Sequence, residues 1–423
     1  MILTILWGLV GLAGLMAVAI ALSPHRSSID WRTVGMGVGL QIIFGIFVIL
    51  TPWGGQVFDA LASFFVTIID FAKEGAAFIF GDLARENTNF GFIFAFQVLP
   101  TIIFFASLMS VLYHLGVMQK IVGAMAWVMR KFMRISGAES LAVAANVFVG
   151  QTEAPLVVRP YIAGMTSSEL LTMMVGGMAT IAGAVLAAYI GLLGGGDPEQ
   201  EIFFAKHLLS ASIMAAPATI VIAKLLMPET GESQTMGNVR LEVKKTAHNA
   251  IEAAAIGAGD GWRLAMNVGA MLLAFVALIA LINWPLEWLG SLTGIEDRLG
   301  RPTDLSVILG YALAPLAFLI GVPAGDVVTV GGLIGQKLVT NEFFAYAQFS
   351  EIQNEMSDKA RLITTYALCG FANFSSIAIQ IGGIGPLAPD RRSDIAAFGL
   401  RAVLGGTLVT MMTATIAGVL HSF

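Results

Sequence analysis

The sequence is poor in charged residues. Asp, Glu, Lys and Arg make up 12% of its 423 residues, whereas 57% of the residues are hydrophobic. Ordinary soluble domains carry about 25% charged residues, and the mean hydropathy of this chain is +0.82. Half the usual charge over this length excludes an ordinary soluble protein. We therefore predict an all-α polytopic membrane protein with the lipid bilayer around it.

Cysteine and histidine are also scarce. The one cysteine, Cys369, excludes an intrachain disulfide framework. None of the five histidines lies within metal-ligand spacing of another. We therefore expect no cofactor and no catalytic metal. The net charge of −5 is too small to indicate a charged partner, and we expect no nucleic-acid partner.

Long apolar runs predict eight transmembrane helices, because each run is long enough to cross the bilayer. They are expected at about 1–22, 33–50, 90–115, 169–193, 203–226, 266–289, 362–384 and 395–420. The first run could be a signal peptide, but it has no basic n-region and no clear cleavage site, which favours a span. Pro100 predicts a kink in the third span.

Three segments between the spans are more polar. Residues 54–89 mix acids with phenylalanines, which predicts a helix lying in the membrane interface. Residues 117–136 are amphipathic and basic, and residues 228–262 predict a cytoplasmic loop with a surface helix. Basic residues cluster in the links after spans one, three, five and seven, so the positive-inside rule places both termini outside.

A polar stretch interrupts an apolar region after the third span. Residues 150–155 read GQTEAP, with three polar side chains between a glycine and a proline that both disfavour helix. At membrane depth, non-helical backbone is tolerated only where it lines a cavity. The stretch therefore predicts the tip of a re-entrant hairpin at about 138–161. A second candidate hairpin at 326–350 has Asn341 and Glu342 at its tip.

The chain repeats this arrangement. Each hairpin is followed by two spans, the first of which is interrupted, at 176–183 in one copy and 369–376 in the other. The interval is 27 residues from Glu153 to Thr180 and 31 from Glu342 to Asn373, so chance is the alternative to a true repeat. Inverted repeats with broken helices are typical of secondary transporters.

These elements divide the chain into four units. The expected units are scaffold spans with the interfacial helix at 1–116, a first repeat at 117–226, a loop with the sixth span at 227–292, and a second repeat at 303–423.

The polar residues at the tips and breaks indicate a binding site. Ionisable groups at membrane depth are costly and usually functional. Carboxylates, amides and hydroxyls suit a neutral, hydroxylated solute, because the basic residues near in sequence are Arg159 and Lys337. The alternative is that the polar side chains only satisfy hairpin backbone.

Two other classes of function fit less well. Residues 257–260, GAGD, match an intramembrane aspartyl-protease motif, but they lie in the predicted polar loop without a partner aspartate on a span. A membrane-embedded enzyme is therefore a remote alternative. A channel would need a continuous polar pore, whereas the polar residues here are concentrated at two tips and two breaks.

The second tip carries a longer motif. Residues 335–346, GQKLVTNEFFAY, resemble the signature G-x-K-x-x-x-N-E-F-V-A-Y of the concentrative nucleoside transporters, with Phe344 where valine is usual. Residues 150–155 and 159–161 resemble the first hairpin of that family, and residues 370–373 resemble its broken seventh helix. The resemblance runs from about residue 90 to the C-terminus, and the chain length resembles the eight-span bacterial branch.

The resemblance implies a homotrimer in the bacterial inner membrane. It would take up nucleosides such as uridine, cytidine or adenosine with a cation. Because the expected site lies between two hairpins broken at mid-membrane, we also predict an alternating-access, elevator-like motion, in which the hairpins and broken helices move against a scaffold of spans one, two, three and six. The implied nucleobase contacts are Gln151, Thr152, Glu153 and Val185. The implied ribose contacts are Glu342, Asn373 and Ser376, with Phe371 alongside.

The family's sodium ligands map onto four positions in the first repeat. They are Asn146, Val149, Thr180 and Ile181. Carbonyls freed at a tip and a break, with the Thr180 hydroxyl, suit a small hard cation. The proton-coupled branch carries G-Q-S-E without the following Ala-Pro, so GQTEAP favours sodium as the coupling ion. Proton coupling is the alternative.

Overall fold

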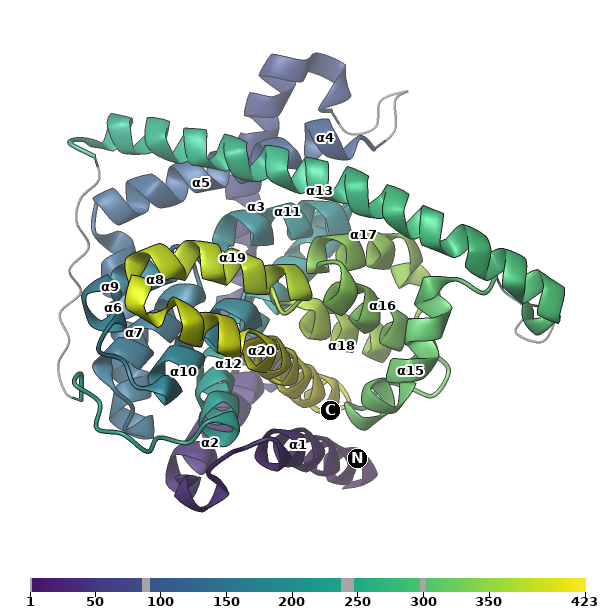
Figure 1. Ribbon diagram of the computed structural model, residues 1–423. Helices are drawn as coiled ribbons and strands as arrows, with labels where there is room; N and C mark the ends of the chain where they lie inside the picture. The colour runs from purple at the N-terminus through teal and green to yellow at the C-terminus, as the bar shows by residue number, and fades with distance from the viewer. Residues whose placement is uncertain (1, 86–91, 237–246, 297–301) are drawn as a thin grey trace.

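The computed structural model describes residues 2–85, 92–236, 247–296 and 302–423, and the regular structure in these ranges is entirely helical (Figure 1). The all-α prediction is confirmed. The basic residues of the link after the predicted fifth span, Arg240, Lys244 and Lys245, lie outside the described residues. So do the end of the predicted interfacial segment and residues 90 and 91 of the predicted third span.

Eight helical stretches of the described chain are long and apolar enough to cross a membrane. They are Ile2–Ala21, Trp31–Leu50, Pro52–Leu83, Phe94–His114, Ser167–Gly194, Pro198–Leu226, Ala250–Thr293 and Pro389–Leu420. The number of candidate spans agrees with the prediction, but the two sets do not contain the same segments. The set includes α3 (Pro52–Phe80), expected in the interface, and lacks the predicted seventh span, which is divided into two 11-residue helices, α18 (Asp358–Leu368) and α19 (Phe374–Ile384).

The predicted third span is also interrupted. It consists of α4 (Phe94–Gln97) and α5 (Leu99–His114), separated at Val98, so the expected irregularity near Pro100 is confirmed. The proline sits in the first turn of α5, where its missing N–H costs no helical hydrogen bond. The basic amphipathic segment that follows forms α6 (Val117–Met133).

The predicted surface helix and sixth span are one continuous helix, α13 (Ala250–Thr293). Its 44 residues give a length of about 66 Å at 1.5 Å per residue. In Figure 1 it crosses the whole width of the molecule beside α5. Only 11% of the residues in its most apolar 18-residue segment are buried within the chain, so most of its surface faces outward.

The bundle has a buried interior and an exposed periphery. The interior consists of α10 (Ser167–Ala179), α11 (Gly183–Gly194), α12 (Pro198–Leu226) and α20 (Arg392–Leu420). In each of these spans, 89% of the residues in the most apolar 18-residue segment are buried. The corresponding share is 28% for α1 (Ile2–Ala21) and 33% for α2 (Trp31–Leu50). The peripheral helices therefore present apolar side chains to the surroundings, as expected of helices in lipid.

Two hairpins enter this bundle. Hairpin 1 consists of α7 (Gly137–Asn146), α8 (Ala154–Val157) and α9 (Arg159–Ile162); hairpin 2 consists of α16 (Val327–Val339) and α17 (Glu342–Ile352), preceded by α15 (Leu305–Leu319). In hairpin 1, Ser136 and Glu139 form a capping box at the start of α7. In hairpin 2, the Asn341 side chain caps α17 by accepting from the Phe344 amide at 2.8 Å. Capping residues in the local sequence therefore determine where α7 and α17 begin.

The break in the fourth span lies within the predicted range of 176–183, towards its C-terminal end. Gly176 and Gly177 are inside α10, and the chain leaves the helix at residues 180–182. Gly176 serves close packing, because an added Cβ would lie 3.2 Å from the Asn146 amide nitrogen. The second break, at residues 369–373, lies within the predicted range.

The two repeats match in register over most of their length. Both α18 and α19 begin 191 residues after their counterparts α10 and α11. At this offset Gln151, and not Glu153, is the counterpart of Glu342. The intervals then agree, because Gln151 to Ala182 and Glu342 to Asn373 are both 31 residues. Figure 1 shows α7 and α10 on one side of α20, and α16 and α18 on the other.

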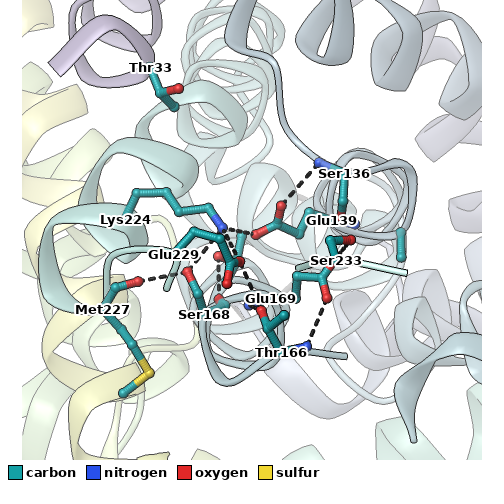
Figure 2. Close-up of polar contacts among 12 residues, drawn as sticks. Thr33, Ser136, Glu139, Thr166, Ser168, Glu169, Lys224, Met227, Glu229 and Ser233 are labelled. Atoms are coloured by element: carbon teal, nitrogen blue, oxygen red, sulfur yellow. Dashed lines mark hydrogen bonds and ion pairs between the residues drawn. The ribbon is translucent and has the colours of Figure 1, made fainter. Parts of the chain in front are cut away.

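An ionic cluster fixes the base of hairpin 1 (Figure 2). The Lys224 ammonium, at the end of α12, lies 2.5 Å from the Glu139 carboxylate at the start of α7 and 3.3 Å from Glu229. It also donates to the Ser168 hydroxyl at 3.0 Å, and that hydroxyl donates to the Met227 carbonyl. The cluster joins α7, α10 and α12 at one end. Residue 415, the register counterpart of Lys224, is a threonine.

Candidate functional site

The two broken helices meet at their breaks. The Phe371 amide donates to the Thr180 carbonyl at 3.3 Å. Gly370 lies against the end of α10, and an added Cβ there would be 2.9 Å from the Met178 carbonyl oxygen. A backbone hydrogen bond and close packing therefore hold the two breaks together. Both hairpin tips lie next to this junction.

The Glu342 carboxylate lies at the tip of hairpin 2 and is buried. One oxygen accepts from the Tyr189 hydroxyl and the other from the Asn373 amide, both at 2.9 Å. The Asn373 side-chain oxygen in turn caps α19 by accepting from the Ser376 amide at 2.9 Å. The carboxylate is thus held in a fixed orientation by both repeats.

Tyr189 is a site residue that the sequence analysis missed. It is fully buried in α11, and its ring packs against those of Phe343 and Tyr346. Buried tyrosine hydroxyls need a partner, and here the partner is Glu342. The available signal was a lone tyrosine in an otherwise apolar half-helix, which by itself does not indicate which carboxylate it meets.

Gln151 lies at the tip of hairpin 1. Its amide nitrogen donates to the Ser376 hydroxyl at 3.0 Å, and its amide oxygen is buried without a partner in the described part of the chain. Gln380 lies nearby; it donates to the Met174 carbonyl at 2.9 Å and likewise keeps its amide oxygen unpartnered. Gly177 faces both glutamines. Two acceptors therefore remain available beside this tip.

The other predicted contacts are placed unequally. Thr152 packs against Gly383. Val185 is buried and Phe371 is half-buried, whereas the Glu153 side chain is exposed. The structure therefore joins Gln151, Glu342, Asn373 and Ser376 by hydrogen bonds and does not bring Glu153 into that network.

The predicted sodium ligands lie where hairpin 1 meets the first break. The Thr180 hydroxyl is 2.7 Å from the Asn146 carbonyl oxygen and 2.9 Å from that of Gly176. Ile181 is fully buried and Val149 half-buried. Both side-chain amide atoms of Asn146 are buried without partners among the described residues. Hard oxygen atoms gathered at a helix C-terminus fit a monovalent cation.

Family models cover most of the chain. Residues 10–83 match "Na+ dependent nucleoside transporter N-terminus", residues 95–196 match "Nucleoside recognition", and residues 207–418 match "Na+ dependent nucleoside transporter C-terminus". The chain is 47% identical to YutK, a transporter of Bacillus subtilis, over 98% of this chain and 99% of that protein. It is 41% identical to sodium/nucleoside cotransporter 2 of Mus musculus over 97% of this chain, which spans 62% of that longer protein.

Solved structures agree. The chain superposes on CNTnw in an outward-facing state with a TM-score of 0.91, at 42% identity over 99% of this chain and 98% of that one. It superposes on CNTnw in an inward-facing substrate-bound state with a TM-score of 0.90, at 42% identity over 100% and 99% of the two chains.

The chain belongs to the concentrative nucleoside transporter family. The resemblance inferred from the tip motif is confirmed. The protein is a nucleoside transporter and not an enzyme, and transporters of this family pass between outward- and inward-facing states. The homotrimer and the external termini stay predictions.

Replacing Tyr189 by phenylalanine tests its place in this nucleoside transporter. The change removes one donor to the buried Glu342 carboxylate, and hydrogen bonds to charged groups contribute roughly 1.5–3 kcal/mol. We expect uridine to bind about tenfold more weakly or worse in calorimetry. Tyr346→Phe is the matched control, because the Tyr346 hydroxyl donates to the Thr365 carbonyl. Equal losses in both variants would contradict a specific role for Tyr189.

Proposed function

We propose that this transporter carries nucleosides into the cell together with sodium. The observation that carries the proposal is the contact of the Thr180 hydroxyl with the carbonyl oxygens of Asn146 and Gly176, because it places a hydroxyl and two carbonyl groups where hairpin 1 meets α10. The sodium dependence named in the matching family models and relatives supports it. Proton coupling is the weaker alternative, because Thr180 supplies a hydroxyl and the tip reads GQTEAP.

In the proposed complex, Asn146, Val149, Thr180 and Ile181 hold the ion. When sodium binds, the Thr180 oxygen becomes a ligand and its proton turns to another acceptor. The ion thereby fixes the tip of hairpin 1 against the break of α10 and α11. Gln151, Thr152, Glu153 and Val185 then face the nucleobase, and sodium binding orders the surface that the base contacts.

The ribose is assigned to the other tip. An ionised carboxylate has about four acceptor positions, and Glu342 uses two of them for Tyr189 and Asn373. The remaining positions suit the two ribose hydroxyl donors. The Ser376 hydroxyl accepts from Gln151, and in the proposed complex it exchanges this partner for the sugar, with Phe371 alongside. A site with unpaired buried acceptors would reject a deoxy sugar.

Sodium coupling has a thermodynamic test. If sodium orders the tip, sodium and uridine raise each other's affinity by the same factor. Thr180→Val removes the hydroxyl ligand while keeping the shape. We expect a higher sodium requirement in the variant, with uridine affinity close to wild type at saturating sodium. Calorimetry across a sodium series checks this. Affinity that ignores sodium but follows pH would indicate proton coupling instead.

The ribose assignment is tested by Glu342→Gln. This change keeps the size but replaces a charged acceptor with a neutral amide. Bonds to charged groups contribute roughly 1.5–3 kcal/mol, so uridine affinity should fall about tenfold to a hundredfold. The loss should be smaller for 2′-deoxyuridine, which makes fewer of these bonds. Glu153→Gln should instead change the ranking among bases. An equal loss for both sugars would make Glu342 a structural residue.

We further propose that transport moves the buried interior against the peripheral helices, in the manner of an elevator. The contrast between the 89% buried share of the interior spans and the 22–33% of α1, α2, α3 and α5 supports such a division. Outward-facing, intermediate and inward-facing structures of CNTnw, which share this fold, support alternating access.

A disulfide across the proposed sliding surface tests the motion. A Cβ added at Gly8 in α1 would lie 3.6 Å from the Cβ of Val419 in α20, which suits a disulfide. In a Cys369→Ser background, the oxidised 8–419 cysteine pair should stop uridine uptake, and reductant should restore it. A pair at Gly399 in α20 and Ile377 in the adjacent α19, whose Cβ atoms would be 3.5 Å apart, should not stop uptake, because we expect both helices to move together. Full uptake with the oxidised 8–419 pair rejects the motion.

A further inference from the structure

Besides Lys224, a second lysine is buried, near the tip of hairpin 2. Lys337, in α16, is 1% exposed. Its ammonium donates to the Ala367 carbonyl oxygen at 2.9 Å and to the Thr410 hydroxyl at 3.3 Å. The Glu342 carboxylate, five residues further along hairpin 2, attracts it electrostatically. Buried lysines are rare unless they are paired, and the proposed nucleoside contacts do not use this one.

The repeat register shows what Lys337 replaces. Lys337 and its two partners, Ala367 and Thr410, have counterparts 191 positions earlier in the first repeat. These counterparts are Asn146, Gly176 and Thr219. These three also meet, since a Cβ on Gly176 would lie 3.2 Å from the Asn146 amide nitrogen and 3.6 Å from the Thr219 methyl carbon. The same three positions therefore form a junction in each repeat.

Both junctions attract a cation for the same physical reason. In the first repeat, the C-terminal ends of α7 and α10 converge there; in the second, the C-terminal ends of α16 and α18 do. Each helix C-terminus carries about half a negative charge and free carbonyl groups. The first junction has no lysine, and its Asn146 amide atoms and Thr219 hydroxyl are buried without partners within the described ranges.

The Gly176 carbonyl of the first junction accepts from the Thr180 hydroxyl, a proposed sodium ligand, so the proposed ion lies beside that junction. We propose that the Lys337 ammonium is a tethered cation, which serves the junction of the second repeat as the sodium ion serves that of the first. It is a positioning residue: it neutralises the converging helix ends, holds the tip of hairpin 2 against the break of α18 and α19, and balances Glu342. Hairpin 2 is then ready for the ribose without an ion. This inference rests on the proposed sodium site and deepens it.

Three variants separate charge from shape. Lys337→Met keeps most of the side-chain stem without the charge, and Lys337→Arg keeps the charge. Lys337→Ala leaves room for a small cation. We expect Lys337→Met to weaken uridine binding about tenfold or more at every sodium concentration, since it removes bonds to a charged group. Lys337→Arg should remain within about threefold of wild type, which is under 1 kcal/mol.

Chemical rescue supplies a readout that a packing role would not move. Methylammonium should raise the uridine affinity of Lys337→Ala in a concentration-dependent way, and tetramethylammonium should not, because it has no N–H donors. Wild type should respond to neither. Equal weakening by Arg and Met, unchanged binding by Met, or absence of rescue would each overturn the proposal.

A measurement on the wild-type protein covers the case in which the variants do not fold. The reversal potential of uridine flux in proteoliposomes gives the number of sodium ions carried per nucleoside. One ion is expected, because the second position is already filled, and two would overturn the proposal. The failure of the sodium site itself is distinguishable: wild-type binding would then ignore sodium, while the Met–Arg contrast and the rescue would still judge Lys337.

Discussion

The structure depends on satisfying broken backbone at membrane depth. A helix that ends inside the bilayer leaves N–H and carbonyl groups without water to pair with. Here each repeat supplies partners for these groups: the Gly183 amide donates to the Phe148 carbonyl at 3.0 Å, and the Phe371 amide donates across the repeats to Thr180. The asparagines Asn341 and Asn373 cap the helices that restart. The candidate binding site lies beside these pairings, where polar side chains remain available to a ligand.

The two repeats share a backbone register but exchange side chains across it. Tyr189 of the first repeat reaches the Glu342 carboxylate at the tip of hairpin 2. Its counterpart 191 positions later, Gln380, lies beside Gln151 at the tip of hairpin 1 through their common neighbour Gly177. The same helical position in each copy therefore serves the opposite tip. One tip therefore carries a carboxylate and the other an amide, which is the asymmetry that the proposed assignment of ribose and base to opposite tips requires.

The sequence predicts the architecture well where glycine, proline and polar residues interrupt apolar runs. Both hairpins, the eight-member set of spans in number and the tip motif follow from such interruptions. The first break also lies inside its predicted range, but Gly176 and Gly177 at the start of that range are helical, because they serve close contact with Asn146 and Gln151. Glycine signals both a bend and a close approach, and a single sequence does not separate the two.

Side-chain partnerships were harder to predict than elements. The loose match between the repeats came from aligning Glu153 with Glu342, since two glutamates look equivalent, whereas helix starts align Gln151 with Glu342. Glu153 accordingly lies outside the hydrogen-bonded network. Tyr189 and Lys337 become meaningful only once the fold places them, because their partners are 153 and 30 residues away in sequence.

The two hairpins place their fixed charges at opposite ends. Hairpin 1 is fastened at its base by the buried Lys224 cluster, and its tip keeps unpartnered atoms on Asn146 and Gln151. Hairpin 2 has a hydrogen bond from Ser357 to Asp326 at its base, and its tip holds the buried ammonium and the doubly bonded carboxylate. A desolvated charge requires partners built into the fold, whereas an unpartnered oxygen can wait for a ligand. Buried atoms without partners among the described residues also occur on Gln336 and Asn341 of hairpin 2. The tips therefore differ in buried charge, which hairpin 2 carries on Lys337 and Glu342.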